Sequence, residues 1–385
     1  MDRITVPREI SYGAGALRSL RYIDCERALI ITDATLRRLR WAEKVERIFQ
    51  DNGVETRVFS EVEPDPSTAN CDQGAEVARQ FEPDLIVGLG GGSAMDAGKA
   101  VWVLYEYPEA TWDWIFSRPR LTNLRQRARY VAIPTTSGTG SEVTFFAVIT
   151  DHRSTPPVKR GFGSREMAPD VAIVDPELTV TMPPSVTADT GFDVLVHAVE
   201  AYVSVAANDF SDPLALQAIK TVFTWLPRAV AHGDDLKARE KMHFASTTAG
   251  IGFTNADLGL VHALAHQLGA VFGVPHGRAN ALMLAPVVRY NAPVAKERYA
   301  EIARAIGLQV EKDEEATAIL AEAIVDLQEK VGIPTTLREL GLEQSEFLLQ
   351  LEAMAENAYL DGCRPGNPRP AEEEDLKELL LGAWR

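Results

Sequence analysis

The chain has few of the residues on which several classes of protein depend. Only three of its 385 residues are cysteines, Cys25, Cys71 and Cys363, and no two of them have C-x-x-C spacing. An odd count without paired spacing gives no disulfide framework and indicates reduced thiols in a cytoplasmic protein. No uninterrupted apolar stretch is long enough to cross a bilayer, so we expect no membrane segment.

Basic residues are also scarce, because 39 lysines and arginines face 55 aspartates and glutamates, for a net charge of −16. A surface of this sign repels phosphate and argues against a nucleic-acid partner. The first residues, M-D-R-I-T-V-P-R, lack the apolar core of a signal peptide, which again favours the cytoplasm. The apolar fraction of 46% suffices for buried cores, and the length favours two domains.

The two halves of the chain differ in pattern. Residues 1–182 alternate short β-rich runs with helical stretches, which predicts a parallel sheet covered by helices. From residue 183 the pattern is helical throughout and rich in Ala and Leu. We therefore expect an α/β domain over residues 1–182 and an all-α domain over residues 183–385. The expected strands are 28–32, 56–59, 85–88, 130–133, 146–150 and 171–174.

Two loops in the first half follow predicted strands and suit a nucleotide. Gly90, Gly91, Gly92 and Ser93 follow the third strand and open a helix, where free backbone N–H groups can hold a pyrophosphate. The pattern is not G-x-G-x-x-G, and a tight turn explains the glycines about as well. The second loop, P-T-T-S-G-T-G-S-E over residues 134–142, also follows a strand. It strengthens the prediction of a nucleotide site, because open α/β sheets bind ligands at the carboxyl ends of their strands.

Asp33 ends the first predicted strand in I-T-D-A-T. A carboxylate at that point can accept a hydrogen bond from a ribose 2′-hydroxyl and repel a 2′-phosphate, which favours NAD over NADP. An N-cap for the next helix explains the residue equally well.

The second half concentrates metal-ligand residues. Asp193 and His197 are four residues apart and share one helix face, and the segment L-V-H-A-L-A-H-Q-L-G-A-V-F-G-V-P-H-G adds His262, His266 and His276. A carboxylate with several imidazoles predicts a Zn or Fe(II) site rather than a Ca or Mg site. Spacing alone does not decide between His262 and His266 as the ligand.

The remaining candidates have simpler explanations. H-A-L-A-H lacks the glutamate of H-E-x-x-H, which argues against a zinc protease. We interpret Glu200 as a solvent-facing helix residue or an acceptor from N–H groups. His152, His232 and His243 have no patterned neighbours and are interpreted as surface or structural residues.

These motifs together resemble the iron-dependent (group III) alcohol dehydrogenase family, whose fold is dehydroquinate synthase-like. The matching stretches cover nearly the whole chain: G-G-G-S-A-M-D-A-G-K-A, P-T-T-S-G-T-G-S-E-V-T, M-P-P-S-V-T-A-D-T-G-F-D-V-L-V-H-A-V-E-A-Y-V-S, A-G-I-G-F-T-N-A and G-L-V-H-A-L-A-H-Q-L-G-A-V-F-G-V-P-H-G-R-A-N-A. The chain is most similar to propanol and butanol dehydrogenases and to the alcohol dehydrogenase half of bifunctional aldehyde-alcohol dehydrogenases. We expect no aldehyde dehydrogenase half before it.

The resemblance implies a dinucleotide-binding first domain, a metal-binding second domain and roles for individual residues. It implies Asp193, His197, His262 and His276 as metal ligands. It leaves His266 off the metal as a proton-relay residue near nicotinamide and substrate, and it places Phe253 in the substrate pocket. The implied cofactor-binding residues are Asp33, Gly91, Gly92, Ser93, Thr135, Thr136, Ser141, Lys159 and Leu178.

We therefore expect an NAD(H)-linked, metal-dependent alcohol dehydrogenase that interconverts short-chain primary alcohols and aldehydes. Fe(II) is the expected metal and Zn(II) is also compatible with the ligand set. The resemblance further implies a homodimer or a higher homo-oligomer. The alternatives are a glycerol or polyol dehydrogenase, a maleylacetate reductase or a dehydroquinate-synthase-like lyase, and a non-catalytic assembly protein that holds a nucleotide or a metal.

Overall fold

The computed structural model describes residues 3–117, 121–154 and 157–385. The chain separates into two compact units, Thr5–Val180 and Thr181–Arg385, and the second unit also takes in the first few residues. The predicted boundary at residue 182 falls beside this division. The functions assigned to the two parts stay predictions.

The first unit is built on a six-stranded sheet in which every pair of neighbours is parallel. The order across the sheet is β1-β8-β5-β4-β2-β3. The predicted parallel sheet is confirmed, although its short edge strand β1 was not expected. The strands are β1 (Glu9–Tyr12), β2 (Arg27–Ile31), β3 (Glu55–Phe59), β4 (Leu85–Gly90), β5 (Arg129–Pro134) and β8 (Val171–Val174).

The strand expected over residues 146–150 exists, but it does not join this sheet. It is β6 (Phe146–Asp151), and it pairs antiparallel with β7 (Val158–Gly163) in a separate two-stranded sheet. A parallel partner would need a crossover connection of a dozen or more residues, whereas only residues 152–157 join β6 to β7. The short connection therefore imposes an antiparallel ribbon.

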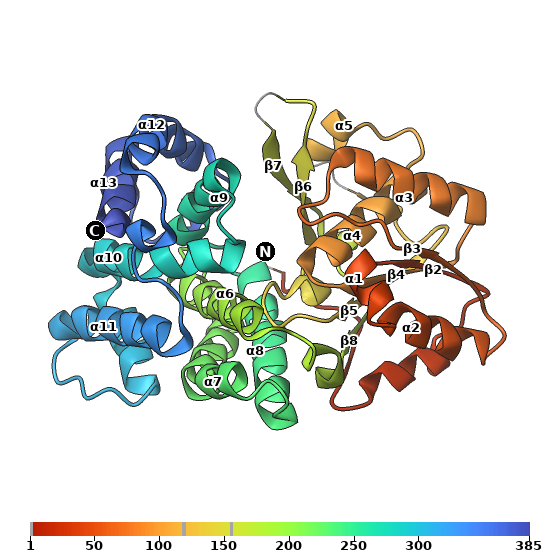
Figure 1. The fold of residues 1–385 in the computed structure, drawn as a ribbon, viewed down its shortest axis with the longest axis horizontal. Helices are drawn as coiled ribbons and strands as arrows, with labels where there is room; N and C mark the ends of the chain where they lie inside the picture. Colours follow the sequence, from red (N-terminus) through yellow and green to blue (C-terminus); the bar gives the residue numbers. More distant parts are fainter. Residues whose placement is uncertain (1–2, 118–120, 155–156) are drawn as a thin grey trace. The chain divides into compact units, whose positions relative to one another are not determined.

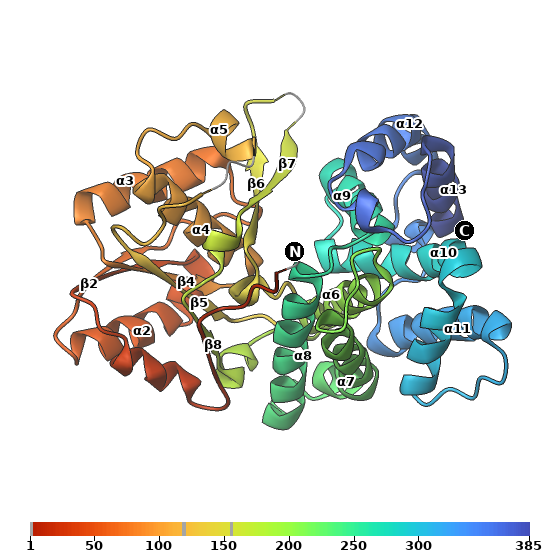
Figure 2. The same ribbon diagram turned by 180° about the vertical axis from the view of Figure 1, so that it is seen from behind.

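Helices cover both faces of the six-stranded sheet, as Figures 1 and 2 show for α3 and α4 on one face and α2 on the other. Alternate residues of β2 point to opposite faces, so Leu29 and Ile31 belong to one apolar core while Ala28 and Ile30 belong to the other. The helical segments of this unit are η1 (Ala16–Tyr22), α1 (Ala34–Arg38), α2 (Trp41–Gln50), α3 (Thr68–Phe81), α4 (Gly92–Glu106), α5 (Trp112–Phe116), η2 (Ser141–Val143), η3 (Arg165–Met167) and η4 (Pro176–Thr179).

The strand order reverses between β2 and β4. From β2 the chain moves outward to β3, then returns past β2 to form β4, and continues through β5 to β8 on the other side. Ligands of open α/β sheets bind at the carboxyl ends of the strands where the order reverses. In this chain those ends carry Asp33 after β2 and the glycine loop after β4.

The second unit is helical, as predicted, and its described residues form no strand. No helix in the described part of the chain combines the length and the apolar character needed to cross a membrane. The segments are α6 (Pro184–Val203), α7 (Ser211–Ala231), α8 (Leu236–Thr254), α9 (Leu260–Phe272), α10 (His276–Ala305), α11 (Asp313–Val331), η5 (Leu337–Leu340), α12 (Gln344–Leu360), η6 (Arg364–Gly366) and α13 (Glu373–Trp384).

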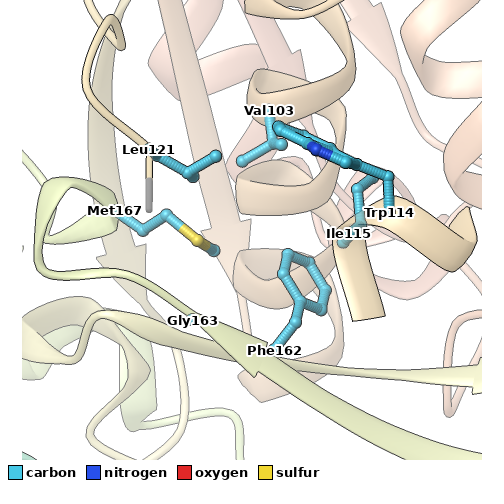
Figure 3. A pocket seen from close by; sticks show the side chains of 7 residues that line it. All are labelled: Val103, Trp114, Ile115, Leu121, Phe162, Gly163 and Met167. Atoms are coloured by element: carbon cyan, nitrogen blue, oxygen red, sulfur yellow. The ribbon is translucent and has the colours of Figure 1, made fainter. Parts of the chain in front are cut away.

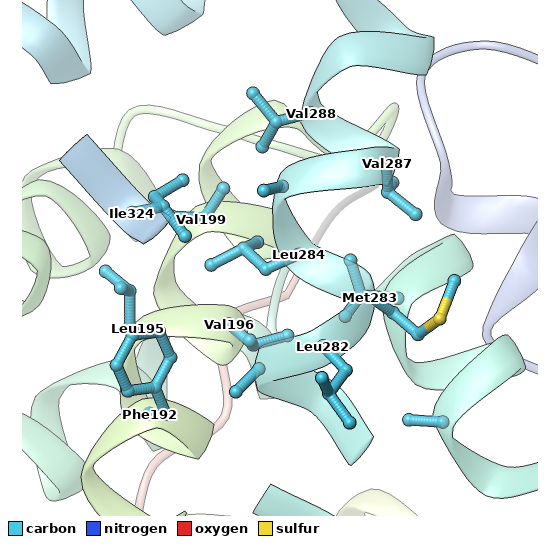
Figure 4. Packing of buried hydrophobic residues seen from close by; sticks show 14 of the residues in the cluster. Phe192, Leu195, Val196, Val199, Leu282, Met283, Leu284, Val287, Val288 and Ile324 are labelled. Carbon is cyan, nitrogen blue, oxygen red and sulfur yellow. The ribbon is translucent and has the colours of Figure 1, made fainter. Parts of the chain in front are cut away.

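Helices α6 and α10 form the centre of this unit's core. Figure 4 shows Phe192, Leu195 and Val196 of α6 packed against Leu284 and its neighbours on α10, and all of these side chains are buried. Close packing of this kind holds side chains in single rotamers. The two helices therefore give a rigid base for the polar residues that they carry.

Candidate active site

Helix α6 carries a row of buried polar side chains. Asp193, His197 and Glu200 occupy positions i, i+4 and i+7, which lie on one face of a helix, and each is less than 5% exposed. A buried carboxylate and a buried imidazole cost free energy unless other polar groups or a cation satisfy them. Neighbouring polar groups or a bound cation must therefore offset the free-energy cost of burying these three side chains.

Two more segments bring imidazoles to the same place. His262 lies on α9 and His276 is the first residue of α10. The Nε2 atoms of His197 and His262 are 3.1 Å apart, and Asp193 Oδ1 lies 3.8 Å from His262 Nε2 and 3.5 Å from His276 Nε2. Such separations are typical of atoms that share one metal ion with bonds of about 2.0–2.2 Å.

The protonation of these groups suits a cation. Burial alone would raise the pKa of Asp193, but the imidazoles of His197, His276 and His262 lower it, so the group is a carboxylate. Burial and the neighbouring imidazoles hold the pKa of His262 well below its usual value, which leaves the ring neutral. An ionised carboxylate and neutral imidazoles are the forms that bind a transition metal.

Glu200 is a buried hydrogen-bond partner of His262. It is not solvent-facing: its carboxylate accepts hydrogen bonds from the backbone N–H of Val261 at 2.7 Å and from His262 Nδ1 at 2.5 Å. The expectation of an N–H acceptor therefore holds. The contact with Nδ1 directs the lone pair of His262 Nε2 toward Asp193, an arrangement common around metal-binding histidines. The spacing of Glu200 from His197 was the only sequence signal.

Asn280 and Phe253 complete the surroundings of the imidazoles. The buried Asn280 side chain donates from Nδ2 to Asp193 Oδ1 at 2.7 Å and lies within 3.3 Å of Nε2 of both His262 and His276. The Phe253 ring stacks on the His197 ring with centroids 4.3 Å apart. Sequence reasoning expected Phe253 near the substrate but did not identify Asn280.

His266 lies beside these residues, with a different partner. Its ring stacks on that of His276 at 5.6 Å, while its Nδ1 donates to Asp361 Oδ2 at 2.8 Å. Asp361 follows α12, almost a hundred residues along the chain, so only the tertiary structure reveals this pair. Burial alone would raise the pKa of Asp361, but its hydrogen bonds from His266 and Cys363 bring the pKa down to about 2.

In the first unit the two predicted nucleotide loops lie side by side. The backbone N–H of Thr135 donates to Gly90 O at 2.9 Å, and a methyl group added at Gly91 would lie 3.4 Å from the Thr136 hydroxyl. Gly91 is the N-cap of α4, and Gly92 and Ser93 form its first turn. Asp33 is the N-cap of α1, where its Oδ1 accepts from the N–H groups of Thr35 and Leu36.

Three other predicted cofactor residues have partners within the chain. Lys159 Nζ forms an ion pair of 2.6 Å with Asp65, whose backbone N–H reaches Ser93 Oγ, so Lys159 lies near the glycine loop. Ser141 is buried, and its hydroxyl donates to Asp96 and accepts from Lys99. Leu178 is buried in the core of the sheet unit. These contacts give Ser141 and Leu178 structural roles besides the predicted ones.

A small pocket in the sheet unit has no lining side chain that could act as an acid, a base or a nucleophile. Figure 3 shows that it is lined by apolar and aromatic side chains and one glycine, without a charged or nucleophilic group: Val103, Trp114, Ile115, Leu121, Phe162, Gly163 and Met167. The buried carboxylates and imidazoles described above lie instead on α6, α9 and α10.

Comparison with known families agrees with this geometry. The model described as iron-containing alcohol dehydrogenase matches residues 7–176, and the model for the C-terminal part of the Fe-containing alcohol dehydrogenase family matches residues 187–384. The chain belongs to the iron-containing alcohol dehydrogenase family. Membership implies binding of a metal, iron, and of a nicotinamide cofactor, and it implies interconversion of alcohols and aldehydes.

Individual relatives cover the chain from end to end. It is 43% identical to an NADPH-dependent butanol dehydrogenase of Clostridium saccharobutylicum, over 99% of this chain and 97% of that protein. It is 41% identical to a 1-propanol dehydrogenase of Salmonella typhimurium, over 99% of both. The bifunctional aldehyde-alcohol dehydrogenase of Escherichia coli is 42% identical over 93% of this chain, which matches only 43% of that longer protein.

Solved structures share the whole fold. The structure of 1,3-propanediol oxidoreductase has a TM-score of 0.93 and 37% identity, and that of the iron-containing alcohol dehydrogenase from Thermococcus thioreducens has a TM-score of 0.91 and 38% identity. Both comparisons cover the full length of both chains. The predicted family, fold class and enzyme class, alcohol dehydrogenase, are therefore confirmed.

Proposed function

We propose that this alcohol dehydrogenase is NAD(H)-linked and acts on short-chain primary alcohols and their aldehydes, with Fe(II) at its metal site and Zn(II) as a compatible substitute. One observation carries the proposal: ligand atoms of Asp193, His262 and His276 lie within 4.8 Å of one another, and Nε2 of His197 lies 3.1 Å from Nε2 of His262. The substrate range is supported by the butanol and 1-propanol named for two relatives.

The four residues fit such an ion by charge as well as by distance. One carboxylate and three neutral imidazoles leave one positive charge of a divalent cation uncompensated. When bound, the metal supplies Lewis-acid polarisation of the substrate oxygen, and the nicotinamide supplies or accepts the hydride. Glu200 fixes the orientation of His262, and the Asn280 amide holds Asp193.

We assign the proton transfer to His266. Its Nδ1–H is held by the ionised Asp361, so its Nε2 is the atom that exchanges a proton with the substrate hydroxyl. Asp361 acts as a positioning residue, because it sets the tautomer and the ring orientation of His266. Phe253 covers the His197 ring with an apolar surface that suits a short alkyl chain.

We assign NAD(H) binding to residues 1–182 and metal binding and catalysis to residues 183–385. The backbone N–H groups of Gly91, Gly92 and Ser93 at the start of α4 would hold the pyrophosphate. Thr135, Thr136, Ser141, Lys159 and Leu178 remain the proposed further contacts. Asp33, at the end of β2, would favour NAD over NADP by repelling a 2′-phosphate.

Two substitutions test the division of roles between the histidines of α9. His262→Ala should lose bound metal, because the other three ligands cannot close the site without it. His266→Ala should keep its metal and turn over slowly. Metal analysis of anaerobically purified protein, run beside an NADH-coupled assay with C2–C6 aldehydes, measures both. Equal metal loss in the two variants would overturn the assignment.

We also propose a cytoplasmic homodimer or higher homo-oligomer. β1 lies at an edge of the sheet, and edge strands are positions at which two chains can pair. Light scattering on the purified chain measures its mass in solution, and a monomer at micromolar concentration would contradict this proposal.

A further inference from the structure

A second group of metal-ligand side chains surrounds Asp361. The imidazole of His266, the carboxylate of Asp361 and the thiol of Cys363 bring their ligand atoms within 4.8 Å of one another, and all three side chains are partly exposed. The three residues come from α9 and from the turn between α12 and η6. None of them belongs to the four proposed metal ligands.

Two donors in this group point at one carboxylate, and the Cys363 sulfur lies beside it. His266 Nδ1 donates to Asp361 Oδ2 at 2.8 Å, and the Cys363 sulfur lies within 4.8 Å of the ligand atoms of both residues. The backbone N–H of Cys363 donates to Asp361 Oδ1 at 2.8 Å and holds the carboxylate in place. A cation that replaced the hydrogens of His266 Nδ1 and the Cys363 thiol would find an imidazole nitrogen, a carboxylate oxygen and a thiolate already gathered.

We propose that His266, Asp361 and Cys363 form a second cation site, which takes a thiophilic divalent ion such as Zn²⁺ or Cd²⁺. A carboxylate and a thiolate balance the two positive charges, so the occupied site is neutral and tolerates partial burial. Around a tetrahedral zinc ion, ligand atoms lie roughly 3.3–3.8 Å apart, which small side-chain rotations reach from the observed spacing.

Occupation of this site changes the protons on two of its ligands. The thiol releases its proton to solvent as the sulfur–metal bond forms. His266 gives up the proton on Nδ1 and gains one on Nε2, so its ring stays neutral and one proton leaves in total. Because Nε2 then carries a hydrogen fixed by the metal on Nδ1, His266 can no longer take up a proton from the substrate. The site would therefore inhibit the enzyme, and this consequence rests on the proposed function.

Cadmium absorption tests the site without any turnover. Thiolate bonded to Cd²⁺ gives an ultraviolet charge-transfer band, and the four proposed ligands of the first site include no thiolate, so that site is silent. We expect the band to saturate near about one Cd²⁺ per chain, to disappear in Cys363→Ser and to weaken in Asp361→Asn. The matched control is Cys25→Ser, which changes a partly exposed thiol of the sheet unit and should leave the band intact. A band that survives Cys363→Ser would overturn the proposal.

Zinc inhibition tests the consequence. In metal-loaded enzyme, excess Zn²⁺ should lower turnover several-fold, and the ratio of rates with and without added zinc should return close to one in Cys363→Ser. Equal inhibition of both proteins would place the inhibiting ion elsewhere and overturn the regulatory proposal. A cadmium band in a protein without turnover on any alcohol would instead support the site and overturn the proposed function.

Discussion

Asp33 combines two roles that a single substitution can separate. Its Oδ1 caps α1, and in the proposed function its negative charge also contacts the ribose 2′-hydroxyl of NAD. Asp33→Ser keeps a hydroxyl cap but removes the charge. We expect the ratio of kcat/KM for NADPH to that for NADH to rise about tenfold or more, because repulsion of a 2′-phosphate is lost.

The control is Asp235→Ser, which makes the same change at the N-cap of α8. It should alter stability by a few tenths of a kcal/mol, as expected between good caps, and leave the cofactor ratio unchanged. An unchanged ratio in Asp33→Ser would show that the carboxylate acts only as a cap.

Substitution of Glu200 tests whether its carboxyl group, which contacts His262 Nδ1, increases the affinity for metal. Burial raises the pKa of Glu200 to about 7, and Glu200→Gln keeps the size of the side chain while it removes the ionisable carboxyl group next to Nδ1. We expect metal affinity to fall by about 10–100-fold, the usual effect of removing such a partner. Competition with a chelator measures the affinity, and unchanged metal retention would contradict the role.

The sequence suggested the proposed metal ligands but not the residues that hydrogen-bond to them. Asp193, His197, His262 and His276 stand out because such residue types are rare in one chain and have helical or turn spacing. Glu200, Asn280 and Asp361 are ordinary polar residues in sequence. Their roles depend on which atoms they meet, and Asp361 meets His266 across 95 positions of chain.

At the scale of the element, the turn from β4 into α4 depends on Gly90. This residue has φ of 152°, which L side chains rarely adopt, and a methyl group there would lie 2.6 Å from Ala94 Cβ. We expect Gly90→Ala to lower the free energy of unfolding by about 1–3 kcal/mol and to weaken NADH binding, because the start of α4 must shift.

Chemical denaturation and NADH fluorescence titration measure the two effects. Gly382→Ala, on α13, is the matched control because a methyl group there meets no atom within 4 Å and the backbone is helical. That variant should be as stable as the parent or slightly more so. A Gly90→Ala variant that matched it in stability and in NADH affinity would contradict the argument.

Helix α8 contains a histidine that should make stability depend on pH. His243 is buried, and burial lowers its pKa from 6.5 to about 3. Between these values the unfolded chain binds a proton that the folded protein does not, so the stability falls as pH falls from about 6.5 toward 3. Above pH 6.5 the ring is neutral in both states and has no such effect.

His243→Gln removes this titration. The stability difference between parent and variant should therefore shift in favour of the variant by up to about 1.4 kcal/mol per pH unit below pH 6. Urea denaturation at several pH values measures the shift, and the exposed His232→Gln serves as the control for the loss of a histidine as such. A parallel pH profile for parent and His243→Gln would exclude the effect.

The antiparallel pair β6 and β7 shows that a sequence pattern can predict a strand without predicting its partner. Residues 146–150 have the composition of a strand, and the prediction of a strand was right, but its membership in the parallel sheet was wrong. Composition indicates extended backbone, whereas the choice of partner depends on the length of the connection and on which edge is free. The same limit applies to β1, whose four residues pair with β8 from a distant part of the chain.

At the scale of the whole molecule, metal and cofactor should stabilise different units. All four proposed ligands belong to Thr181–Arg385, and the proposed nucleotide loops belong to Thr5–Val180. Removal of metal by a chelator should therefore increase hydrogen exchange in α6, α9 and α10 and leave the sheet unchanged. At a metal concentration of a hundred times Kd, the lost stabilisation is about 2.7 kcal/mol.

Addition of NADH without metal gives the complementary experiment. It should protect the ends of β2, β4 and β5 from exchange and leave the amides of α9 as they were. Faster exchange in the sheet after chelation alone would show that the metal is not confined to the helical unit.

The order of residues along the chain was enough to predict the class of each half and the enzyme family, and to propose the two nucleotide loops and the set of metal-ligand residues. Local periodicity and rare residues at regular spacing indicate these features, and both can be read from the amino-acid sequence without a structure. Tertiary structure alone decided that β6 leaves the parallel sheet, that Glu200 faces His262, and that Asp361 and Cys363 meet at His266. The contacts of Glu200 with His262 and of Asp361 and Cys363 with His266 join distant segments, which the packing of helices brings together, whereas the short connection between β6 and β7 decides the partner of β6.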